Sequence, residues 1–348
     1  MPQITLVPTG QTFTADSGEA VLTAALRAGL NLPHSCKGGH CASCRARVLS
    51  GPFVYPGERP VGLSAEEAAE GFALLCQARA LDDLRIETRE RRPAPDVEVR
   101  SLPCRIERLE RKAEDVMAVF LRLPAVEPLH FRAGQYLDIM LSEGRRRSFS
   151  IASAPADGAM LELHVRRASS SGFTAQLFDR TSPGTLLRIE GPLGQFWFRG
   201  ESPRPALMIG GGTGYAPLRS MLRQLQAEGD RRRVVLYWGA RNSADLYEDA
   251  WLRELEERRP GFEYRPVLSE PGPGDRSAAA RQGLVHEVAL AELTDPSGFD
   301  VYASGPPVMV EAIREQFIAA GLPREQLFFD SFDFAPDTLD RIRAGRPG

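Results

Sequence analysis

The sequence predicts a multidomain protein: a small α+β domain, then an antiparallel β-barrel, then a doubly wound α/β domain. Three observations predict this order. A cysteine-rich loop near the N-terminus is surrounded by short alternating segments and one amphipathic helix, and residues 102–198 repeat short alternating segments separated by turn signals. After Pro203, apolar strands alternate with helices, as in a parallel sheet. The length of 348 residues suits two or three domains.

Composition and charge exclude several classes of partner. The formal net charge is −3 and the isoelectric point is about 6.1, so neither nucleic acid nor an anionic membrane surface is expected to bind. No apolar run is long enough to cross a bilayer. The chain opens on a predicted strand instead of a signal peptide, which favours the reducing cytoplasm and makes disulfides unexpected.

Local signals predict the elements of the first domain. Residues 3–7 and 11–14 alternate around a tight turn and form a hairpin. Ser17 is expected to cap the helix that follows. A capping box of Ser64 and Glu67 starts a short second helix.

Four cysteines form the most specific pattern in the chain. Cys36, Cys41 and Cys44 are separated by four and then two residues, and Cys76 follows much later. A C-x4-C-x2-C spacing with a distant fourth cysteine is the plant-type ligand pattern for a [2Fe-2S] cluster, whose iron prefers thiolates. Two glycines after Cys36 let the backbone pass close to such a cluster.

Other uses of the cysteines fit the spacing less well. A structural zinc site favours two knuckles of similar short spacing, and only one side of this set has one. His34 and His40 flank the ligands without forming the Cys-x-His pairs of a Rieske centre, so they are expected around the cluster or in solvent. Cys104 lies in a strand pattern and is predicted to be a buried apolar residue.

By these cysteines, residues 1–90 resemble a plant-type ferredoxin domain, which implies a β-grasp fold. Residues 91–96 are polar and contain two prolines, which indicates a stiff linker. The predicted parts are a ferredoxin domain at 1–92, a linker at 93–100, a flavin-binding barrel at 101–199, a dinucleotide-binding domain at 200–336 and a tail at 337–348.

A second motif, Arg147-Ser148-Phe149-Ser150, lies in the predicted barrel. Alone it is typical of a surface strand, but between a ferredoxin and a dinucleotide domain it resembles the Arg-x-Tyr/Phe-Ser motif of the ferredoxin-NADP reductase family. The resemblance implies a flavin whose phosphate meets Arg147, whose ring lies against Phe149 and whose N5 lies near Ser150. A flavin needs these three kinds of partner: a cation, a flat apolar group and a hydrogen bond near the reactive nitrogen.

The resemblance also implies a site for the flavin pyrophosphate at the turn before the next helix. In the family, backbone N–H groups and a Ser or Thr at the helix start bind this group, which places Ser171, Gly172 and Thr174 there, after Val165 on the preceding strand. Ser170-Ser171 stands where relatives have a glycine pair, and an ordinary strand-to-helix turn is the alternative. Relatives with an N-terminal ferredoxin domain generally use FAD, so FAD is favoured over FMN.

A glycine loop follows a buried strand and precedes a helix in the C-terminal domain. Its residues Gly212, Thr213 and Gly214 resemble the G-T-G-x-A-P loop where nicotinamide dinucleotide binds in the same family, and glycines let a backbone approach a pyrophosphate. Arg241 ends the next strand, near where the adenosine ribose is expected. Such an arginine suits the 2′-phosphate of NADPH but also occurs in NADH users, so NADH is the predicted donor and NADPH the alternative.

Two further segments are expected beside the nicotinamide and the flavin. Ser304-Gly305-Pro306 stands where the family has Cys-Gly-Pro, which implies that Ser304 lies at the hydride-transfer position and that Gly305 and Pro306 contact the dinucleotide. Phe332 belongs to a segment resembling the terminal acidic-x-aromatic segment of the family, and a final core strand is the alternative. Ser150, Ser304 and Phe332 are the predicted catalytic residues.

Together the three modules predict a reductase that passes electrons from NADH through FAD and the [2Fe-2S] cluster to a protein acceptor that docks near the ferredoxin domain. NADH gives two electrons at once, the cluster takes one, and a flavin converts between the two. Residues 237–239 and 301–303 resemble the CDP-6-deoxy-delta-3,4-glucoseen reductases, and oxygenase reductase components share the domain order. The predicted acceptor is a multicomponent oxygenase; the alternatives are a sugar-nucleotide deoxygenation enzyme and a non-catalytic module that has kept the fold.

Overall fold

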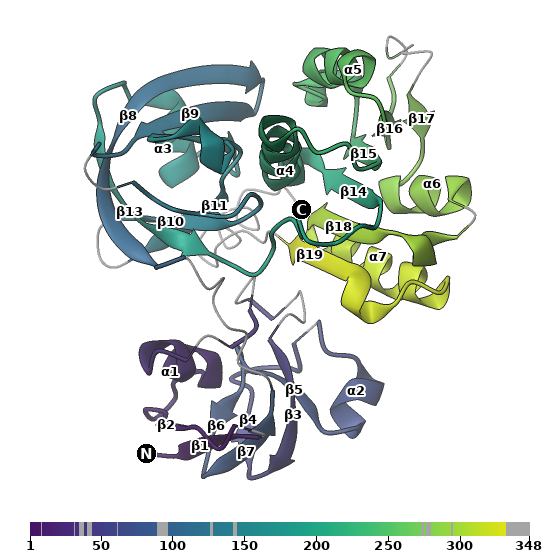
Figure 1. The fold of residues 1–348 in the computed structure, drawn as a ribbon. Helices are drawn as coiled ribbons and strands as arrows, with labels where there is room; N and C mark the ends of the chain where they lie inside the picture. Colours follow the sequence, from purple (N-terminus) through teal and green to yellow (C-terminus); the bar gives the residue numbers. More distant parts are fainter. Residues whose placement is uncertain are drawn as a thin grey trace. The chain divides into compact units, whose positions relative to one another are not determined.

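The computed structural model describes residues 1–7, 9–30, 32–34, 38–39, 44–60, 62–88, 97–125, 128–141, 145–272, 275, 280–293 and 295–331. The chain divides into two compact units, Met1–Asp96 and Val97–Gly348 (Figure 1). The division falls inside the predicted linker 93–100, and the other domain boundaries stay predictions.

The first unit is a mixed sheet with helix α1 packed on it. The strand order is β2-β1-β7-β3-β5, in which β1 and β7 are parallel and the other neighbours are antiparallel. Ile4 and Leu6 of β1 and Leu22 of α1 belong to its apolar core. The elements are β1 (Gln3–Val7), β2 (Thr12–Thr14), α1 (Val21–Arg27), β3 (Arg45–Ser50), β4 (Phe53–Val54), α2 (Ala65–Ala69), β5 (Phe72–Leu74), β6 (Arg79–Ala80) and β7 (Leu84–Glu87).

Helix α1 begins later than predicted. Ser17 does not cap it, because the N-cap is Ala20 and no side chain caps the first turn. The N–H of Leu22 donates instead to the carbonyl oxygen of Leu75, at 2.9 Å. A side chain at the N-cap usually accepts a hydrogen bond from such an N–H group at the start of a helix. Here a distant backbone carbonyl accepts it instead, and the prediction for Ser17 was wrong for this reason.

The second unit begins with an antiparallel barrel. Its strand order is β11-β10-β13-β8-β9-β12, and a bridge between Ile151 and Leu163 brings β12 back to the end of β11. Alternate residues of β12, including Leu161, Leu163 and Val165, face the barrel core. The elements are β8 (Arg100–Ala113), β9 (Val116–Arg122), β10 (Tyr136–Met140), β11 (Arg146–Ser150), β12 (Met160–Arg166), α3 (Phe173–Asp179) and β13 (Leu186–Leu193).

A parallel sheet follows in the order β17-β16-β15-β14-β18-β19. Helices α4 and α5 pack on one face, and α6 and α7 pack on the other (Figure 1). The strand order reverses beside β14, and α/β sheets bind ligands at the carboxyl ends of strands at such a switch point. The elements are β14 (Ala206–Gly211), α4 (Tyr215–Glu228), β15 (Val234–Ala240), α5 (Asp249–Arg258), β16 (Phe262–Leu268), β17 (Arg281–Gln282), α6 (Val285–Glu292), β18 (Asp300–Gly305), α7 (Pro307–Ala319) and β19 (Leu327–Ser331).

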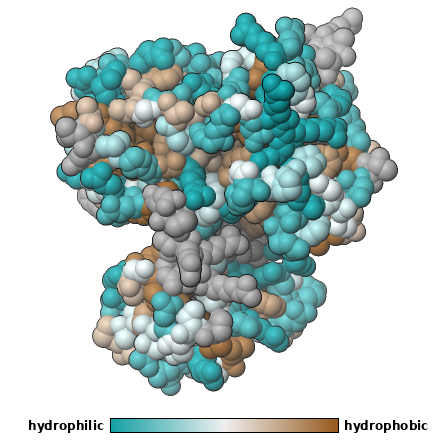
Figure 2. All heavy atoms as spheres, in the orientation of Figure 1, coloured by the Kyte–Doolittle hydropathy of each residue, from teal (hydrophilic) through white to brown (hydrophobic). Residues whose placement is uncertain are grey.

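Figure 2 shows hydrophobic residues interspersed with hydrophilic ones over the visible face of the barrel. Within the described ranges, no helix is both long enough and apolar enough to span a bilayer.

Candidate functional site

Two of the four predicted cluster ligands, Cys44 and Cys76, lie among the described residues; Cys36 and Cys41 lie outside them. The carbonyl oxygen of Cys44 accepts a hydrogen bond from the N–H of Leu75, the residue before Cys76, at 3.2 Å. Both cysteines are buried. Because β3 and β5 are antiparallel, the start of β3 and the end of β5 bring these two cysteines to the same end of the sheet.

Gly39, in the loop between the first two predicted ligands, shows why that loop contains glycine. Its φ is +85°, and a Cβ there would lie 2.9 Å from Cγ of Gln77 and 3.0 Å from Cβ of Pro60. Gly39 therefore lies close to the side chain of Gln77, the residue after Cys76. A glycine packed this closely beside the residue that follows a predicted ligand fits a backbone that passes close to a [2Fe-2S] cluster.

The two described thiols differ in their surroundings from the fifth cysteine. The phenol of Tyr55 lies near both thiols. Burial raises the pKa of Tyr55, and the nearby charges of Cys44 and Cys76 raise it further. A hydrogen bond from the N–H of Leu74 acts in the opposite direction. Cys104 lies in the barrel core instead, where burial raises its pKa to about 12. Its predicted role as a buried apolar residue is confirmed.

Strand β11 carries the first predicted flavin contacts. The ring centroid of Phe149 lies 6.0 Å from that of Phe173, the first residue of α3, and Arg147 is partly buried on the same strand. Ser150 is 6% exposed, and its Oγ has no hydrogen-bond partner among the described residues. Because an unpaired buried hydroxyl is costly, a ligand that completes this hydrogen bond, such as a flavin, fits the site.

The turn before α3 contains the other predicted flavin contacts, which differ in their exposure and hydrogen bonding. Gly172 is the N-cap of α3 with a φ of +88°, and Ser171 is exposed. The Oγ1 of Thr174 accepts a hydrogen bond from the N–H of Ala168 at 3.2 Å, so this hydroxyl closes the turn. Val165 belongs to the barrel core, and its predicted contact with the flavin stays a prediction.

The glycine loop and the end of β18 lie against each other at the switch point. A Cβ on Gly214 would overlap the carbonyl oxygen of Ser304, and a Cβ on Gly211 would lie 3.0 Å from Cδ of Pro306. This close approach requires glycine and leaves backbone N–H groups at the carboxyl edge of the sheet. The fold thereby brings together the predicted dinucleotide contacts Gly212, Thr213, Gly214, Gly305 and Pro306.

Two buried hydroxyls at this edge have no hydrogen-bond partner among the described residues. Ser304 is fully buried, and Ser331, on the next strand, pairs in register with Gly305. Ser331 was not predicted, because its burial depends on the pairing of β18 with β19. Phe332, the predicted residue beside it, lies outside the described range.

Arg241 follows β15 and is largely exposed. Its Nε lies 3.4 Å from Oδ2 of Asp245, whose carboxylate is mostly buried. A carboxylate therefore already accompanies the predicted ribose-binding arginine.

The outward face of β12 carries polar residues that no sequence motif marks as site residues. Glu162, His164 and Arg166 alternate with the core residues of this strand. Arg166 pairs with Asp115 at 3.0 Å, and a Cβ added to Gly212 would lie 3.4 Å from its Nη2. The alternation of apolar and polar residues was the available signal, but it does not say which element the polar face meets.

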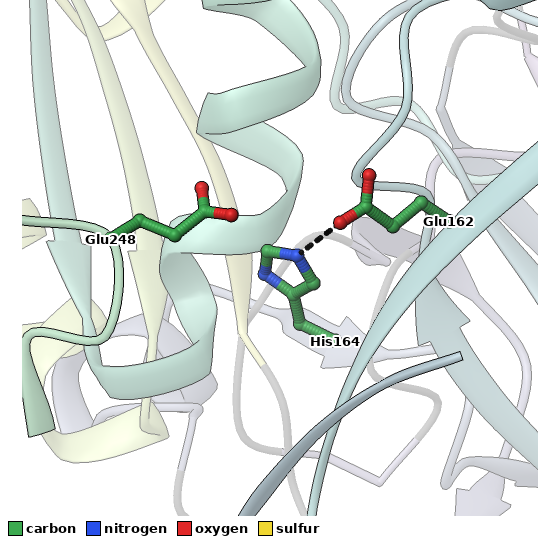
Figure 3. Close-up of side chains that lie close together, drawn as sticks. All are labelled: Glu162, His164 and Glu248. Atoms are coloured by element: carbon green, nitrogen blue, oxygen red, sulfur yellow. Dashed lines mark hydrogen bonds and ion pairs between the residues drawn. The ribbon is translucent and has the colours of Figure 1, made fainter. Parts of the chain in front are cut away.

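A buried ionic cluster joins β12 to the helices of the parallel sheet. Figure 3 shows His164 between the carboxylates of Glu162 and Glu248, with its Nε2 3.1 Å from Oε1 of Glu162. Arg219 of α4 donates to both carboxylates, at 2.8 Å to Glu162 and 2.7 Å to Glu248. Burial would raise the pKa of Glu162, but the hydrogen bond from His164 and the charge of Arg219 outweigh it and lower the pKa to about 2.

Family models match all three parts of the chain. Residues 4–81 match the 2Fe-2S iron-sulfur cluster binding domain, residues 103–198 the oxidoreductase FAD-binding domain, and residues 208–315 the oxidoreductase NAD-binding domain. These matches confirm the predicted fold class and the three predicted cofactor types.

Similar proteins cover nearly the whole chain. The CDP-6-deoxy-L-threo-D-glycero-4-hexulose-3-dehydrase reductase of Yersinia pseudotuberculosis is 36% identical over 94% of this chain and 98% of its own length. The reductase subunit of an aromatic O-demethylase from Amycolatopsis is 37% identical over 87% of this chain and 90% of its own length. Among solved structures, an Amycolatopsis cytochrome P450 reductase has a TM-score of 0.74 at 33% identity and covers 95% of this chain and 99% of that one.

Proposed function

Because the chain belongs to the iron-sulfur flavoprotein reductases, which join a 2Fe-2S domain to FAD-binding and NAD-binding domains, we propose that it passes electrons from NADH to the protein acceptor of a multicomponent oxygenase. The observation that carries this proposal is the meeting of the glycine loop with Ser304 at the switch point, next to Arg166 of the barrel. When bound, FAD accepts two electrons as a hydride and releases them one at a time. Reduced thiols at the cluster suit the cytoplasm as the compartment.

The proposed flavin site uses the residues of β11 and of the turn before α3. Arg147 neutralises the FAD phosphate, the ring of Phe149 packs against the isoalloxazine, and the Oγ of Ser150 makes its missing hydrogen bond there. The backbone at Ser171 and Gly172 meets the pyrophosphate. Thr174 supports this turn through its bond with Ala168.

The proposed dinucleotide site lies at the carboxyl edge of the parallel sheet. Backbone N–H groups of Gly212, Thr213 and Gly214 hold the pyrophosphate, and Ser304 lies where the hydride leaves. The nucleotide is NADH in this proposal, because the carboxylate of Asp245 beside Arg241 disfavours the 2′-phosphate of NADPH.

The acceptor docks near the cluster-binding domain in this proposal. An oxygenase is favoured by the relatives named as the reductase subunit of an aromatic O-demethylase and as the ferredoxin reductase in carbazole 1,9a-dioxygenase; the latter structure has a TM-score of 0.70 at 27% identity. A second candidate acceptor is a sugar-nucleotide dehydratase, favoured by the Yersinia relative that covers 94% of this chain.

The test is an anaerobic titration of the purified protein with NADH, followed by visible absorption. We expect the flavin bands to bleach first and the iron-sulfur bands to follow, and we expect cytochrome c to be reduced in the steady state. A spectrum without flavin, or one indifferent to NADH, would contradict the proposal. Adding purified oxygenase or dehydratase components to the reduced protein then distinguishes the two acceptors by the rate of reoxidation.

A further inference from the structure

Helix α4 is fixed to the barrel by a row of polar side chains on one of its faces. Oγ of Ser220 donates to the carbonyl oxygen of Ser153 at 2.6 Å, and Arg223 pairs with Asp157 at 2.7 Å. Arg219 lies at the buried end of this row and is 7% exposed. The row connects the helix to residues 152–157, the segment directly after β11.

Arg219 binds acceptors from both sides of the contact between the barrel and the parallel sheet. Its Nη1 donates to Oε2 of Glu162 at 2.8 Å and to the carbonyl oxygen of Ala152 at 3.0 Å. Its Nε donates to Oε2 of Glu248, just before α5, at 2.7 Å. One rigid guanidinium therefore ties two barrel positions to the dinucleotide-binding part.

The cluster of Glu162, His164 and Glu248 resembles a metal site in composition, but both of its carboxylates already have cationic partners. The ligand atoms of these three residues lie within 4.8 Å of one another. Arg219 pairs with both carboxylates, and Nζ of Lys112 lies 3.6 Å from Oε1 of Glu248. A divalent cation would have to displace a buried guanidinium, so the group acts as an ion-pair network.

The ion-pair network around Arg219 involves residues that lie close in sequence to both proposed cofactor sites. Ala152 follows the proposed flavin contact Ser150 by two residues, and Arg219 follows the end of the glycine loop, Gly214, by five. Helix α4 begins at Tyr215, directly after that loop, and its first turns are buried. The hydrogen bond from Arg219 to Ala152 therefore connects segments that lie close in sequence to the two proposed cofactor sites.

We propose that Arg219 is a positioning residue for hydride transfer, which holds the flavin-binding strand β11 and the dinucleotide-binding loop at a fixed separation; this inference rests on the function proposed above. In the step that it serves, the hydride leaves the nicotinamide with two electrons, the flavin gains them, and NAD⁺ remains. Reacting atoms must approach to about 3–3.5 Å, and a misplacement of about 1 Å can cost a rate factor of about 100. Arg219 touches neither cofactor in this proposal.

The experiment measures anaerobic flavin reduction by stopped flow over a range of NADH concentrations, in the FAD-saturated full-length protein. In Arg219→Lys, a single ammonium group replaces the planar guanidinium that donates to three acceptors. Glu248→Gln is a milder second variant that keeps the packing. Arg223→Ala is the matched control, because it removes a partly exposed ion pair between the same helix and the same barrel segment.

We expect Arg219→Lys to lower the limiting rate of flavin reduction by about tenfold or more, with half-saturation by NADH changed less than about threefold. The deuterium isotope effect with NADH labelled at the transferred position should rise, because hydride transfer becomes more rate-limiting. Glu248→Gln should show the same pattern at smaller size, and Arg223→Ala should match the unmodified protein.

Two results overturn the inference. One is an unchanged limiting rate and isotope effect in both network variants. The other is a rate loss that only follows loss of FAD or that equals the loss in Arg223→Ala, since this would indicate a purely structural role. If the unmodified protein is not reduced by NADH at all, the proposed function itself fails, and this result is distinguishable from the other two.

Discussion

Glu162 keeps its charge in a buried position because two partners are supplied by different parts of the fold. Its carboxylate meets His164 on the same strand and Arg219 on helix α4. The pKa of Glu162 in the folded protein, about 2, therefore lies below its ordinary value of 4.5. A depressed carboxyl pKa contributes stability above the unfolded-state pKa, and that stability is lost as the pH falls from about 4.5 toward 2.

This shift predicts a pH-dependent effect of Glu162→Gln. The variant should lose on the order of 3 kcal/mol of unfolding free energy at pH 7, and the loss should shrink as the pH falls below about 4.5. Urea unfolding followed by tryptophan fluorescence is the measurement, because all three tryptophans, at 197, 238 and 251, lie in the second unit. Glu107→Gln is the control: Glu107 pairs with two arginines at the barrel surface and should show little effect at any pH. A loss for Glu162→Gln that is equal at pH 7 and pH 3.5 would refute this explanation.

Arg241 and Asp245 give a second prediction for single residues. If Asp245 disfavours the 2′-phosphate, Asp245→Asn should raise kcat/KM for NADPH by about tenfold while changing that for NADH by less than about threefold. The ratio of the two values, measured with cytochrome c as acceptor, checks this. Asp249→Asn, which removes the charge from a half-buried pair with Arg253 in α5, serves as the control. An unchanged ratio would mean that Asp245 does not face the ribose.

The sequence predicted some residues of the candidate site and missed others for a physical reason. Ser150 and Ser304 belong to local motifs, and the structure places both hydroxyls in buried positions without partners among the described residues. Arg219, by contrast, meets a glutamate 57 residues earlier and another 29 residues later. No local spacing encodes such a contact, because it exists only after the barrel and the parallel sheet have packed together.

At the scale of elements, alternation and capping predicted most strands and helices. The capping box of Ser64 and Glu67 is confirmed, with both hydrogen bonds at 3.1 Å. The cap at Ser17 was wrong, since the first turn of α1 finds its acceptors on a segment more than 50 residues away. Local signals succeed where the partner is local and fail where tertiary contacts replace it.

Because the glycine loop lies so close to β18, we expect a single methyl group added at Gly214 to weaken NADH binding strongly. Gly214 has helical φ and ψ values that alanine adopts readily, so the cost of Gly214→Ala comes from the overlap of its Cβ with the backbone of Ser304 and Gly305. The loop must shift away from β18, and the concentration of NADH for half-maximal flavin reduction should rise by about tenfold or more.

Gly200→Ala is the matched control for this variant, because nothing lies within 4 Å of its added Cβ. Near-normal half-saturation in Gly214→Ala, with a normal melting temperature, would mean that the loop does not hold the dinucleotide.

At the scale of the whole molecule, the two compact units divide the proposed chemistry. The cluster ligands lie in Met1–Asp96, and the proposed hydride-transfer site lies in Val97–Gly348, each with its own apolar core. A change confined to the first unit can therefore separate the reduction of the flavin by NADH from the transfer of electrons through the cluster.

Cys76→Ala is expected to separate the two steps. Removing one of four thiolates should abolish the iron-sulfur absorption and lower cytochrome c reduction by about a hundredfold, while NADH still reduces the flavin at close to the normal rate. Stopped-flow spectra at the flavin and iron-sulfur bands measure both quantities in one experiment. Cys104→Ala is the control, because burial raises the pKa of that thiol to about 12 and the structure places it in the barrel core. If Cys76→Ala still reduces cytochrome c normally, the flavin passes electrons directly to acceptors and the proposed route through the cluster is wrong.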